Sequence, residues 1–539
     1  MIKEVSFFSE STLLTKERLE HFTLSAFALE PYCKTSELKP DSHFEIVFTH
    51  KIETVRTASY TWSSDFAFYI AGPLSPKILR LENGMYVQAN TTVGFWEIDP
   101  HNHYKLLWRL NPDNSRILAQ YEGQENFKTL VNVPLDLEGK ALKLLVTDKK
   151  PLEWSRSKIP FSAIACFTDH CDFDTLENLK LQRELFKQSE VKVTKGLFLH
   201  HFSKREDNAS WENDAEELQK WVADGHELAY HSLSQSLKED AQSFTEFQHF
   251  EAPQPNMPTW IDHGFQPYNL SLIQKNNIKQ ETFFSKMQQQ HICNFWNYID
   301  SGTATQGVVN QLNPQHFTLN AFYKGLQNTS FKDKTGLLVK NIFFHFYANE
   351  ALIATYKTLA SRVKKVLLGR KLHQLPGLFK AVFSVIQPLA AVLLHWRKSK
   401  NRVYPLAKYN PLLFSFIING KTMSVFQTLE LLDFKNTLSP KMLDAFSGEK
   451  GVFIAHTYFS VPMAYHKGRM FTTPSSICPE VAANFSYLGK LIKEEKIWNP
   501  TFMELASYFR LLEQLVFDLD TDGTVISNNN PDIHFRYAD

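Results

Sequence analysis

The chain has 539 residues, which is too many for one ordinary hydrophobic core and indicates two or three domains. Hydrophobic residues make up 43% of the chain and charged residues 21%, as in a folded soluble protein, and the formal net charge of +1 gives no sign of nucleic-acid binding. The cysteines are few and scattered and form no CxxC pair, which argues against a disulfide framework and favours a reducing compartment. The N-terminus lacks a basic region followed by an apolar core, so we expect a cytoplasmic protein.

Residues 40–150 alternate apolar and polar side chains at a period of two. HFEIVFTHKI (43–52), KILRLENGMYVQAN (77–90) and YKLLWRL (104–110) are typical strands, and Glu82-Asn83-Gly84 is a typical turn between them. The pattern predicts an antiparallel β domain over residues 1–150, arranged as a sandwich.

The pattern changes after residue 160. FSAIACFTDH (161–170) reads as a strand and TLENLKLQRELFKQ (175–188) as an amphipathic helix, with Asp174 and Glu177 as its predicted cap. Strands and helices then alternate to residue 305 and resume at 445–515, which predicts parallel strands with crossover helices, in a barrel or an open sheet. Residues 306–444 would be a mainly helical, basic insertion, and residues 516–539 a C-terminal β-hairpin.

Histidine and aspartate mark the carboxyl ends of the predicted strands, where parallel α/β domains bind ligands. A lone His or Asp at such a place carries little weight, but six together are hard to explain as loop polarity, because loops use Ser, Gly and Asn at least as often. All six predicted strand ends carry such residues: Asp169 and His170, His200 and His201, His231, Asp262 and His263, Asp300, and His456.

This set of side chains suits a metal. Imidazole and carboxylate together bind zinc or another divalent first-row metal and leave a coordination position open. Such an ion polarises a carbonyl and activates water while a nearby carboxylate acts as the base. The strand ends therefore predict a hydrolytic metal site.

Three segments in this order resemble the polysaccharide deacetylase (NodB-homology) family: IACFTDHCD (164–172), GHELAYHSLSQS (225–236) and IAHTYFS (454–460). The resemblance covers about residues 160–300 and 445–515. It implies an α/β fold with a distorted (β/α)7 barrel, and a divalent metal, with zinc first and cobalt or nickel as alternatives. It also implies that water removes an N- or O-acyl group from a sugar.

The resemblance assigns roles to residues of the first and last segments. Asp169 matches the catalytic base, and His170 or Asp172 takes the metal-ligand role of the family's second aspartate. His456 matches the late histidine, which serves as an acid or orients the base.

The second family motif, His-Ser/Thr-x-x-His, matches only in part. His231 keeps the first metal-binding histidine, but Gln235 stands at the second, and glutamine is a poor zinc ligand. The third ligand would then be His263, His170 or His226. The family's arginine motif has a faint echo in Phe265-Gln266-Pro267-Tyr268, without the charged residue. The residues expected to contact substrate are Tyr268, Asp262, Asp300 and His200.

The resulting hypothesis is a metal-dependent hydrolase that removes an acyl group from a glycan in surface polysaccharide metabolism. A glycoside hydrolase on the same barrel, or a catalytically silent glycan-binding or assembly protein, remains open because fold does not fix function.

Residues 351–429 contain 13 Lys or Arg and no Asp or Glu, which leaves a net charge of −12 on the rest of the chain. Basic clusters flank the apolar run LPGLFKAVFSVIQPLAAVLLHW (375–396), a composition typical of segments that lie on anionic membranes. A helical subdomain that packs on the barrel with a solvated basic face is an equal alternative, and a phosphate-bearing ligand is compatible with either. On the first reading the protein would associate with the inner face of the membrane and its glycan would be lipid-linked.

Overall fold

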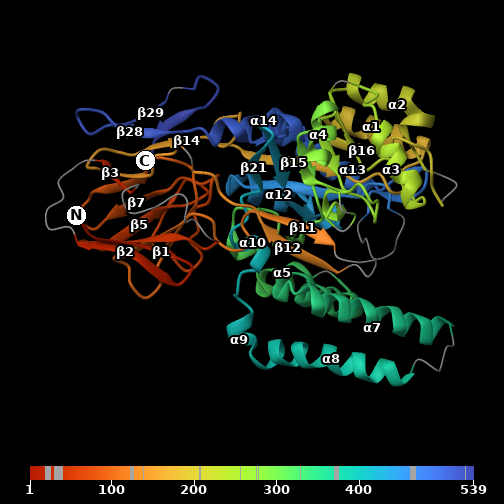
Figure 1. Ribbon diagram of the computed structural model, residues 1–539, viewed down its shortest axis with the longest axis horizontal. Coiled ribbons are helices and arrows are strands. Elements are labelled where there is room, and N and C mark those ends of the chain that lie inside the picture. The colour runs from red at the N-terminus through yellow and green to blue at the C-terminus, as the bar shows by residue number, and fades with distance from the viewer. Residues whose placement is uncertain are drawn as a thin grey trace.

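The computed structural model describes the chain except residues 19–25, 30–39, 122–126, 138, 205–207, 255, 275, 277, 328, 370–374, 462–468 and 529, and the side chains of residues 361–381. Figure 1 shows three parts: an N-terminal β region, an α/β region, and a pair of helices that projects from the α/β region. The α/β class and the antiparallel N-terminal sheets expected from the sequence are confirmed.

The N-terminal region consists of two antiparallel sheets, with strand orders β2-β1-β4-β10-β9 and β3-β13-β8-β7-β5-β6. Inward-facing residues of the alternating strands, such as Phe44, Trp96 and Trp108, are fully buried in a core of their own. The strands are β1 (Ile2–Ser9), β2 (Thr12–Arg18), β3 (Ala26–Ala28), β4 (His43–Phe48), β5 (Ile52–Arg56), β6 (Trp62–Ser63), β7 (Ile78–Leu81), β8 (Tyr86–Ala89), β9 (Phe95–Ile98), β10 (Lys105–Arg109) and β13 (Lys143–Thr147).

The C-terminal end of the chain returns to the N-terminal region. Strand β30 (Phe535–Tyr537) pairs with β14 (Leu152–Trp154), and β28 (Phe517–Leu519) forms a hairpin with β29 (Val525–Ser527). At this junction the buried carboxylate of Glu153 accepts hydrogen bonds from Arg56 at 2.8 Å and from Arg536 at 2.7 Å. Two cations thus neutralise one buried anion between parts of the chain that lie far apart in sequence.

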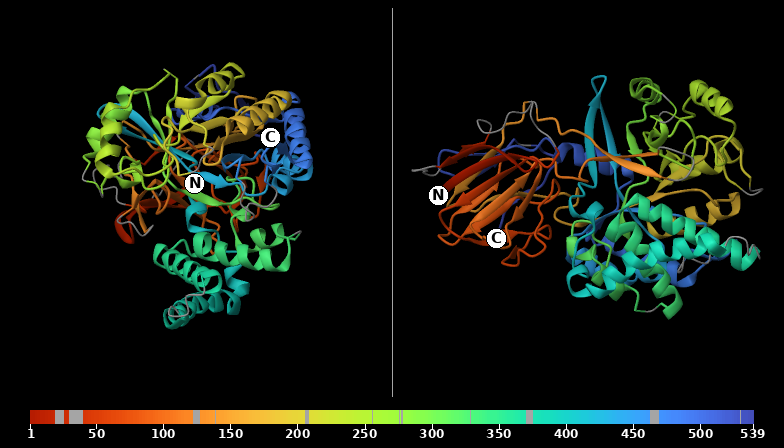
Figure 2. Two further views of the ribbon diagram at one scale, coloured as in Figure 1. Left: turned by 90° about the vertical axis from the view of Figure 1, so that its right-hand side faces the viewer. Right: turned by 60° about the horizontal axis from the view of Figure 1, so that its bottom comes forward.

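Eleven strands form one curled, mainly parallel sheet in the α/β region (Figure 2). Its path runs β20-β23-β24-β15-β16-β17-β18-β19-β22-β21, and β27 pairs with β15, so the described strands leave the sheet open between β20 and β21. The strands are β15 (Ala163–Asp169), β16 (Thr194–Leu197), β17 (Glu227–Tyr230), β18 (Thr259–Ile261), β19 (Asn294–Trp296), β20 (Asp300–Thr303), β21 (Leu413–Ile418), β22 (Lys421–Phe426), β23 (Thr428–Glu430), β24 (Val452–Thr457) and β27 (Ile497–Trp498).

The central strands of this sheet are buried along their whole length, as covered parallel strands are. β15 and β24 lie side by side in parallel register, with Thr168 opposite His456 and Asp169 opposite Thr457. Helices lie between these strands, as the alternating pattern predicts in general. They are α1 (Leu176–Ser189), α2 (Trp211–Ala223), α3 (Asp240–His249), α4 (Gln280–Gln289), α11 (Phe434–Thr437), α12 (Pro440–Gly448), α13 (Pro479–Lys493) and α14 (Phe502–Leu512). The sequence analysis did not single out α3, α4, α11 and α12.

Helix α1 begins one residue later than expected, so the carboxylate of Asp174 does not cap the helix. Thr175 is the N-cap and forms a capping box with Asn178, so Asp174 is free for another role. Asp174 instead forms an ion pair with the ammonium group of Lys195 at 2.5 Å. Asp169, at the end of β15, is the second carboxylate on this ammonium group, and all three side chains are buried.

The insertion is helical only in its middle. Its helices are α5 (Leu319–Gly325), α6 (Phe331–Asn341), a π-helical turn (Ile342–Tyr347), α7 (Glu350–Gly369), α8 (Leu375–Leu394), α9 (Trp396–Ser399) and α10 (Pro405–Lys408). Residues 413–430, which we placed in the helical insertion, form β21 to β23 of the large sheet, because the apolar runs LFSFII and MSVFQTL are strands. The basic cluster at 362–371 lies outside the described side chains.

A ribbon of two strands leaves the N-terminal region and packs on the α/β region. β11 (Ile117–Tyr121) pairs with β12 (Lys128–Asn132), and the ribbon shares its buried side chains with the α/β core rather than with the sandwich. The domain boundary expected at residue 150 therefore does not describe this segment.

Removing the buried lysine should destabilise the protein. Lys195→Met leaves the carboxylates of Asp169 and Asp174 buried without a counter-charge, and breaking such a pair costs about 3–5 kcal/mol of unfolding free energy. Urea unfolding followed by tryptophan fluorescence measures the shift. Lys220→Met is the matched control, because Lys220 pairs with the exposed Glu216 on the surface of α2 and should leave the midpoint nearly unchanged. Equal midpoints for the two variants would contradict the structural role of Lys195.

Candidate metal centre

A cavity of about 590 Å³ lies at the carboxyl ends of the parallel strands. Its lining comes from residues that follow β15, β17 and β18, from the end of β19 and the segment after it, from β20, β23 and β24, and from the insertion helices and the β11–β12 ribbon. Parallel α/β folds bind ligands at this edge. The lining includes most of the histidines and aspartates that the sequence analysis singled out: His170, Asp172, His231, Asp262, His263, Asp300 and His456.

Three of these side chains form a metal triad, which we define as Asp172, His231 and His263. One ligand atom from each lies within 4.8 Å of the others. Nε2 of His231 lies 3.2 Å from one carboxylate oxygen of Asp172, and Nδ1 of His263 lies 3.4 Å from the other. The triad could hold a metal ion, and two imidazoles with one carboxylate are a donor set that suits zinc with an open position.

Main-chain carbonyls orient both imidazoles of the triad. Nδ1 of His231 lies 3.3 Å from the carbonyl oxygen of Ile261, and Nε2 of His263 lies 2.8 Å from that of Gln235. A carbonyl only accepts, so each ring must donate from that nitrogen, and a neutral ring then presents a lone pair on its other nitrogen. Both lone pairs face the Asp172 carboxylate, an arrangement of acceptors that a cation between them would satisfy.

Gln235 supports the triad rather than joining it. Its side-chain amide donates to the main-chain oxygen of Asp172 at 2.7 Å, and its own main-chain oxygen is the one that holds His263. Gln235 therefore positions two of the three ligands. His263 completes the set, and His170 and His226, the other candidates for the third ligand, do not.

A histidine–aspartate pair lies next to the triad. Nδ1 of His456 is 3.2 Å from the Asp300 carboxylate, which also accepts the Thr428 hydroxyl at 2.6 Å. Burial alone would lower the pKa of His456, but the carboxylates of Asp300 and Glu430 raise it above its ordinary value. Nε2 of His456 is buried at the cavity and has no hydrogen-bond partner among the described residues.

His170 lies between the two groups. Its ring stacks on His456 with 3.9 Å between centroids and meets His231 edge-on at 4.6 Å. Burial, reinforced by the neighbouring imidazoles, lowers the pKa of His170 well below its ordinary value. Trp296 packs against both His170 and His456, and Tyr298 lies beside Trp296, so an aromatic wall adjoins the histidines.

Asp169, expected as the catalytic base, lies in the buried network with Lys195 and does not line the cavity. The Thr457 hydroxyl at 3.0 Å and the main-chain N–H of Phe459 at 3.1 Å also donate to its carboxylate. Burial raises the pKa of Asp169, although the Lys195 ammonium opposes the shift. The structure therefore corrects the expectation of a base that faces the cavity.

Four further residues differ from their expected surroundings. Tyr268 is buried in the core, stacked on Phe247, and His200 does not line the cavity. Asp262 borders the cavity, but its carboxylate accepts the main-chain N–H groups of residues 270 and 271, and burial raises its pKa to about 6. His226 precedes β17, at the opposite end of that strand, and packs on Trp221.

Several lining residues escaped the sequence analysis. Tyr121 and Lys128 come from the β11–β12 ribbon, and Lys340 and Lys357 from helices α6 and α7 of the insertion. Nothing in their local sequence separates them from other exposed residues, because long-range packing brings them to the cavity. Trp296, by contrast, ends the observed strand β19; the sequence analysis extended that strand to Asp300 and so passed over Trp296.

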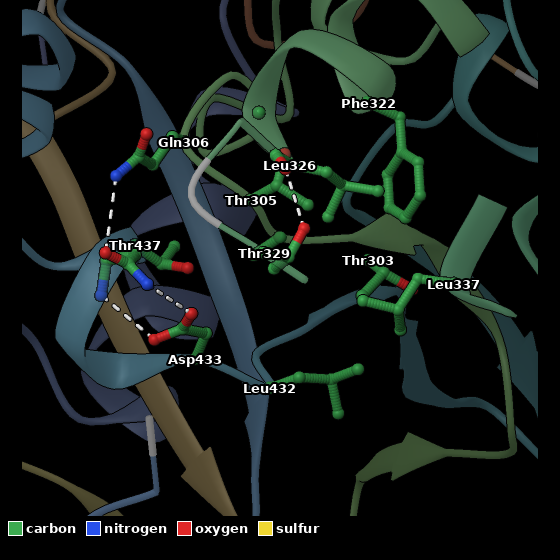
Figure 3. Close-up of a pocket in the computed structure, with 13 residues that line it drawn as sticks. Thr303, Thr305, Gln306, Phe322, Leu326, Thr329, Leu337, Leu432, Asp433 and Thr437 are labelled. Carbon is green, nitrogen blue, oxygen red and sulfur yellow. Dashed lines mark hydrogen bonds between the residues drawn. The ribbon is translucent and has the colours of Figure 1, made fainter. Parts of the chain in front are cut away.

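A second cavity, of about 40 Å³, lies between α5, α6 and α11 (Figure 3). Its lining is mainly apolar or hydroxyl-bearing. Its carboxylate, Asp433, already caps α11 through the main-chain N–H of Asn436 at 2.9 Å. This small cavity therefore offers no cluster of reactive groups comparable to the metal triad.

Replacing Gln235 by methionine should weaken metal binding. Gln235→Met keeps the volume but removes the donor that holds the Asp172 main chain, and the loss of such supporting contacts lowers metal affinity by about 10- to 100-fold. Zinc titration against a competing chelator measures the change. Gln219→Met, the same substitution on the exposed face of α2, should bind zinc like the wild type. Unchanged affinity in Gln235→Met would mean that the Asp172 loop needs no support from this side chain.

Comparison with known proteins assigns the chain to no family. No family model, curated protein or solved structure matches it. The chemistry of the centre is therefore inferred from its own residues.

Proposed function

We propose that the protein is a metal-dependent hydrolase that removes an acyl group from a glycan. One observation carries the proposal: the metal triad, with both imidazoles held by main-chain carbonyls, opens into the same cavity as the His456–Asp300 pair. The resemblance to polysaccharide deacetylases, and with it a distorted (β/α)7 barrel, agrees with this arrangement but belongs to the proposal.

Asp172, His231 and His263 would hold the ion, which fits zinc best and cobalt or nickel next. A divalent ion held there would polarise an acyl carbonyl and activate a water molecule. The triad has three protein donors, which leaves room for substrate and water, as catalytic zinc sites require.

Side chains of the protein supply the proton transfer and the positioning that the ion does not. Asp300 holds His456 through Nδ1, so that Nε2 faces the cavity and, in the protonated ring, can donate to the departing amine or alcohol. Asp169 would act indirectly, by fixing the loop that carries Asp172 through Lys195. The aromatic wall of Trp296 and Tyr298, with Tyr121 beside it, offers apolar ring faces to a sugar.

A glycoside hydrolase on the same fold is the weaker alternative. That reaction needs two carboxylic groups that face the scissile bond. Apart from Asp172 in the triad, the lining carboxylates are engaged: Asp262 accepts main-chain N–H groups, Asp300 holds His456, and Glu430 accepts the Thr303 hydroxyl at 3.0 Å. The donor set therefore favours acyl transfer to water.

Loss of a triad histidine should remove metal and activity together. We expect the wild type to carry about one divalent ion per chain and His231→Ala to lose most of it, because one of three protein ligands is gone. Elemental analysis gives the metal content, and acetate release from N- and O-acetylated oligosaccharides gives the activity. His249→Ala, an exposed histidine on α3, should match the wild type in both. Wild-type protein that takes up neither zinc, cobalt nor nickel would instead support a catalytically silent protein.

Removing the Asp300 charge should change the pH dependence of turnover. An acid must be protonated to act, and Asp300 helps to raise the pKa of His456, so the rate should fall only as the pH rises above that pKa. In Asp300→Asn the pKa of His456 drops, the alkaline limb of the kcat profile moves to lower pH, and kcat falls by about 10²- to 10⁴-fold. Metal content should stay the same, and Asp113→Asn on the surface serves as the control. An unshifted limb would remove His456 as the acid.

A further inference from the structure

Helix α8 exposes a continuous apolar face. Phe383 is 73% exposed, Ile386 53%, Leu393 60% and Leu394 82%. With about 3.6 residues per turn, these four side chains lie within about 100° of the helix circumference. Figure 1 shows α8 as the outer member of the α7–α8 pair that projects from the molecule, with α7 on its inner side.

This exposed face is not the side on which α8 packs. Val385 and Val392, on another side of the helix, are buried, and the main-chain oxygen of Pro388 accepts the hydroxyl of Tyr347 at 3.0 Å. The helix is therefore already anchored, and the exposed face adds nothing to the described packing. Clustered exposed apolar residues of this kind mark a contact surface.

The charge of the surrounding segment indicates what this surface contacts. Residues 351–429 carry 13 basic side chains and no acidic one. Arg397 and Lys398 follow directly after α8 and are exposed. An apolar face next to the exposed cations Arg397 and Lys398, in a segment without acidic residues, suits a partner that is apolar within and anionic at its surface.

We infer that the exposed face of α8 docks on a membrane of anionic lipid. Phe383, Ile386, Leu393 and Leu394 enter the boundary between headgroups and acyl chains, and Arg397 and Lys398 contact lipid phosphates. The helix lies in the plane of the surface. No helix in the described part of the chain is long and apolar enough to cross a membrane.

The helices of the insertion connect the exposed face of α8 with the cavity. Helix α7 packs along α8 and contributes Lys357 to the cavity, and α6, two elements earlier, contributes Lys340. A substrate held at the membrane would reach the cavity beside these helices. This consequence rests on the proposed function and specifies its substrate as a glycan attached to a lipid.

Vesicle co-sedimentation tests the docking with the full-length protein. The protein should pellet with vesicles of phosphatidylcholine and phosphatidylglycerol at low salt, and less at high salt, and should stay in the supernatant with phosphatidylcholine alone. Phe383→Ser/Leu394→Ser should lower the bound fraction constant about tenfold or more. Arg397→Gln/Lys398→Gln should do the same on anionic vesicles only.

The matched control is Ile526→Ser on the β28–β29 hairpin, an exposed apolar residue (45%) in a distant part of the molecule. It should bind vesicles like the wild type. Protein that stays in the supernatant with anionic vesicles at low salt would overturn the proposal. So would a wild type that self-associates in light scattering while the Phe383→Ser/Leu394→Ser variant is monomeric and vesicle binding is absent, because α8 would then contact a second copy.

Metal content and acetate release from soluble oligosaccharides separate this proposal from the proposed function. The docking variants should keep both at the wild-type level, because the four apolar residues lie outside the cavity. Conversely, His231→Ala should bind anionic vesicles as the wild type does. Loss of vesicle binding in His231→Ala would show that docking depends on the metal centre and would contradict a separate surface.

Discussion

The candidate metal centre depends on one buried cation. Lys195, on β16, binds Asp169 at the end of β15 and Asp174 just before α1, so the loop between them is held at both ends. That loop carries His170 and Asp172. Because the three charges are removed from water, their attraction is strong and their separation would be costly. The rigid loop lets Asp172 meet two histidines that come from other strands.

Support for the centre is arranged in layers. The triad side chains are oriented by the main-chain oxygens of Ile261 and Gln235, and Gln235 also fixes the Asp172 main chain. The His456–Asp300 pair stands on separate strands and is joined to the triad by the His170 ring. Pre-organisation of this kind leaves little reorganisation for ligand binding.

The strand-end rule identified much of the centre from sequence, because parallel strands carry their carboxyl ends to one edge. Asp172, His231, His263 and His456 reach the cavity as expected, whereas Asp300 reaches it from the first residue of β20 rather than from a strand end. The rule failed where local sequence does not determine the partner. It could not show that Lys195, inside a strand, neutralises Asp169, since a lysine in a short strand reads as solvent-exposed.

The limits of the fold prediction have the same cause. Period-two alternation identified the sandwich, and alternating strands and helices identified the parallel sheet. The β11–β12 ribbon, ILAQY and KTLVN, does not alternate, and periodicity gives no sign that it packs on the α/β region and brings Tyr121 and Lys128 to the cavity. The insertion expected over residues 306–444 rests on the break in the strand–helix alternation, which hides the strands at 413–430 because short apolar runs fit either structure.

The Glu153 junction has a consequence for the order in which the chain can assemble. The buried carboxylate of Glu153 pairs with Arg56, which is synthesised early, and with Arg536, which is synthesised after the whole α/β region. During synthesis the sandwich can form with a single counter-charge, but its full neutralisation must await the final strand, because β30 pairs with β14 across almost the whole α/β region. Contacts so distant in sequence form late in folding. A nascent chain that has not yet reached β30 would therefore expose an incompletely paired anion at this junction.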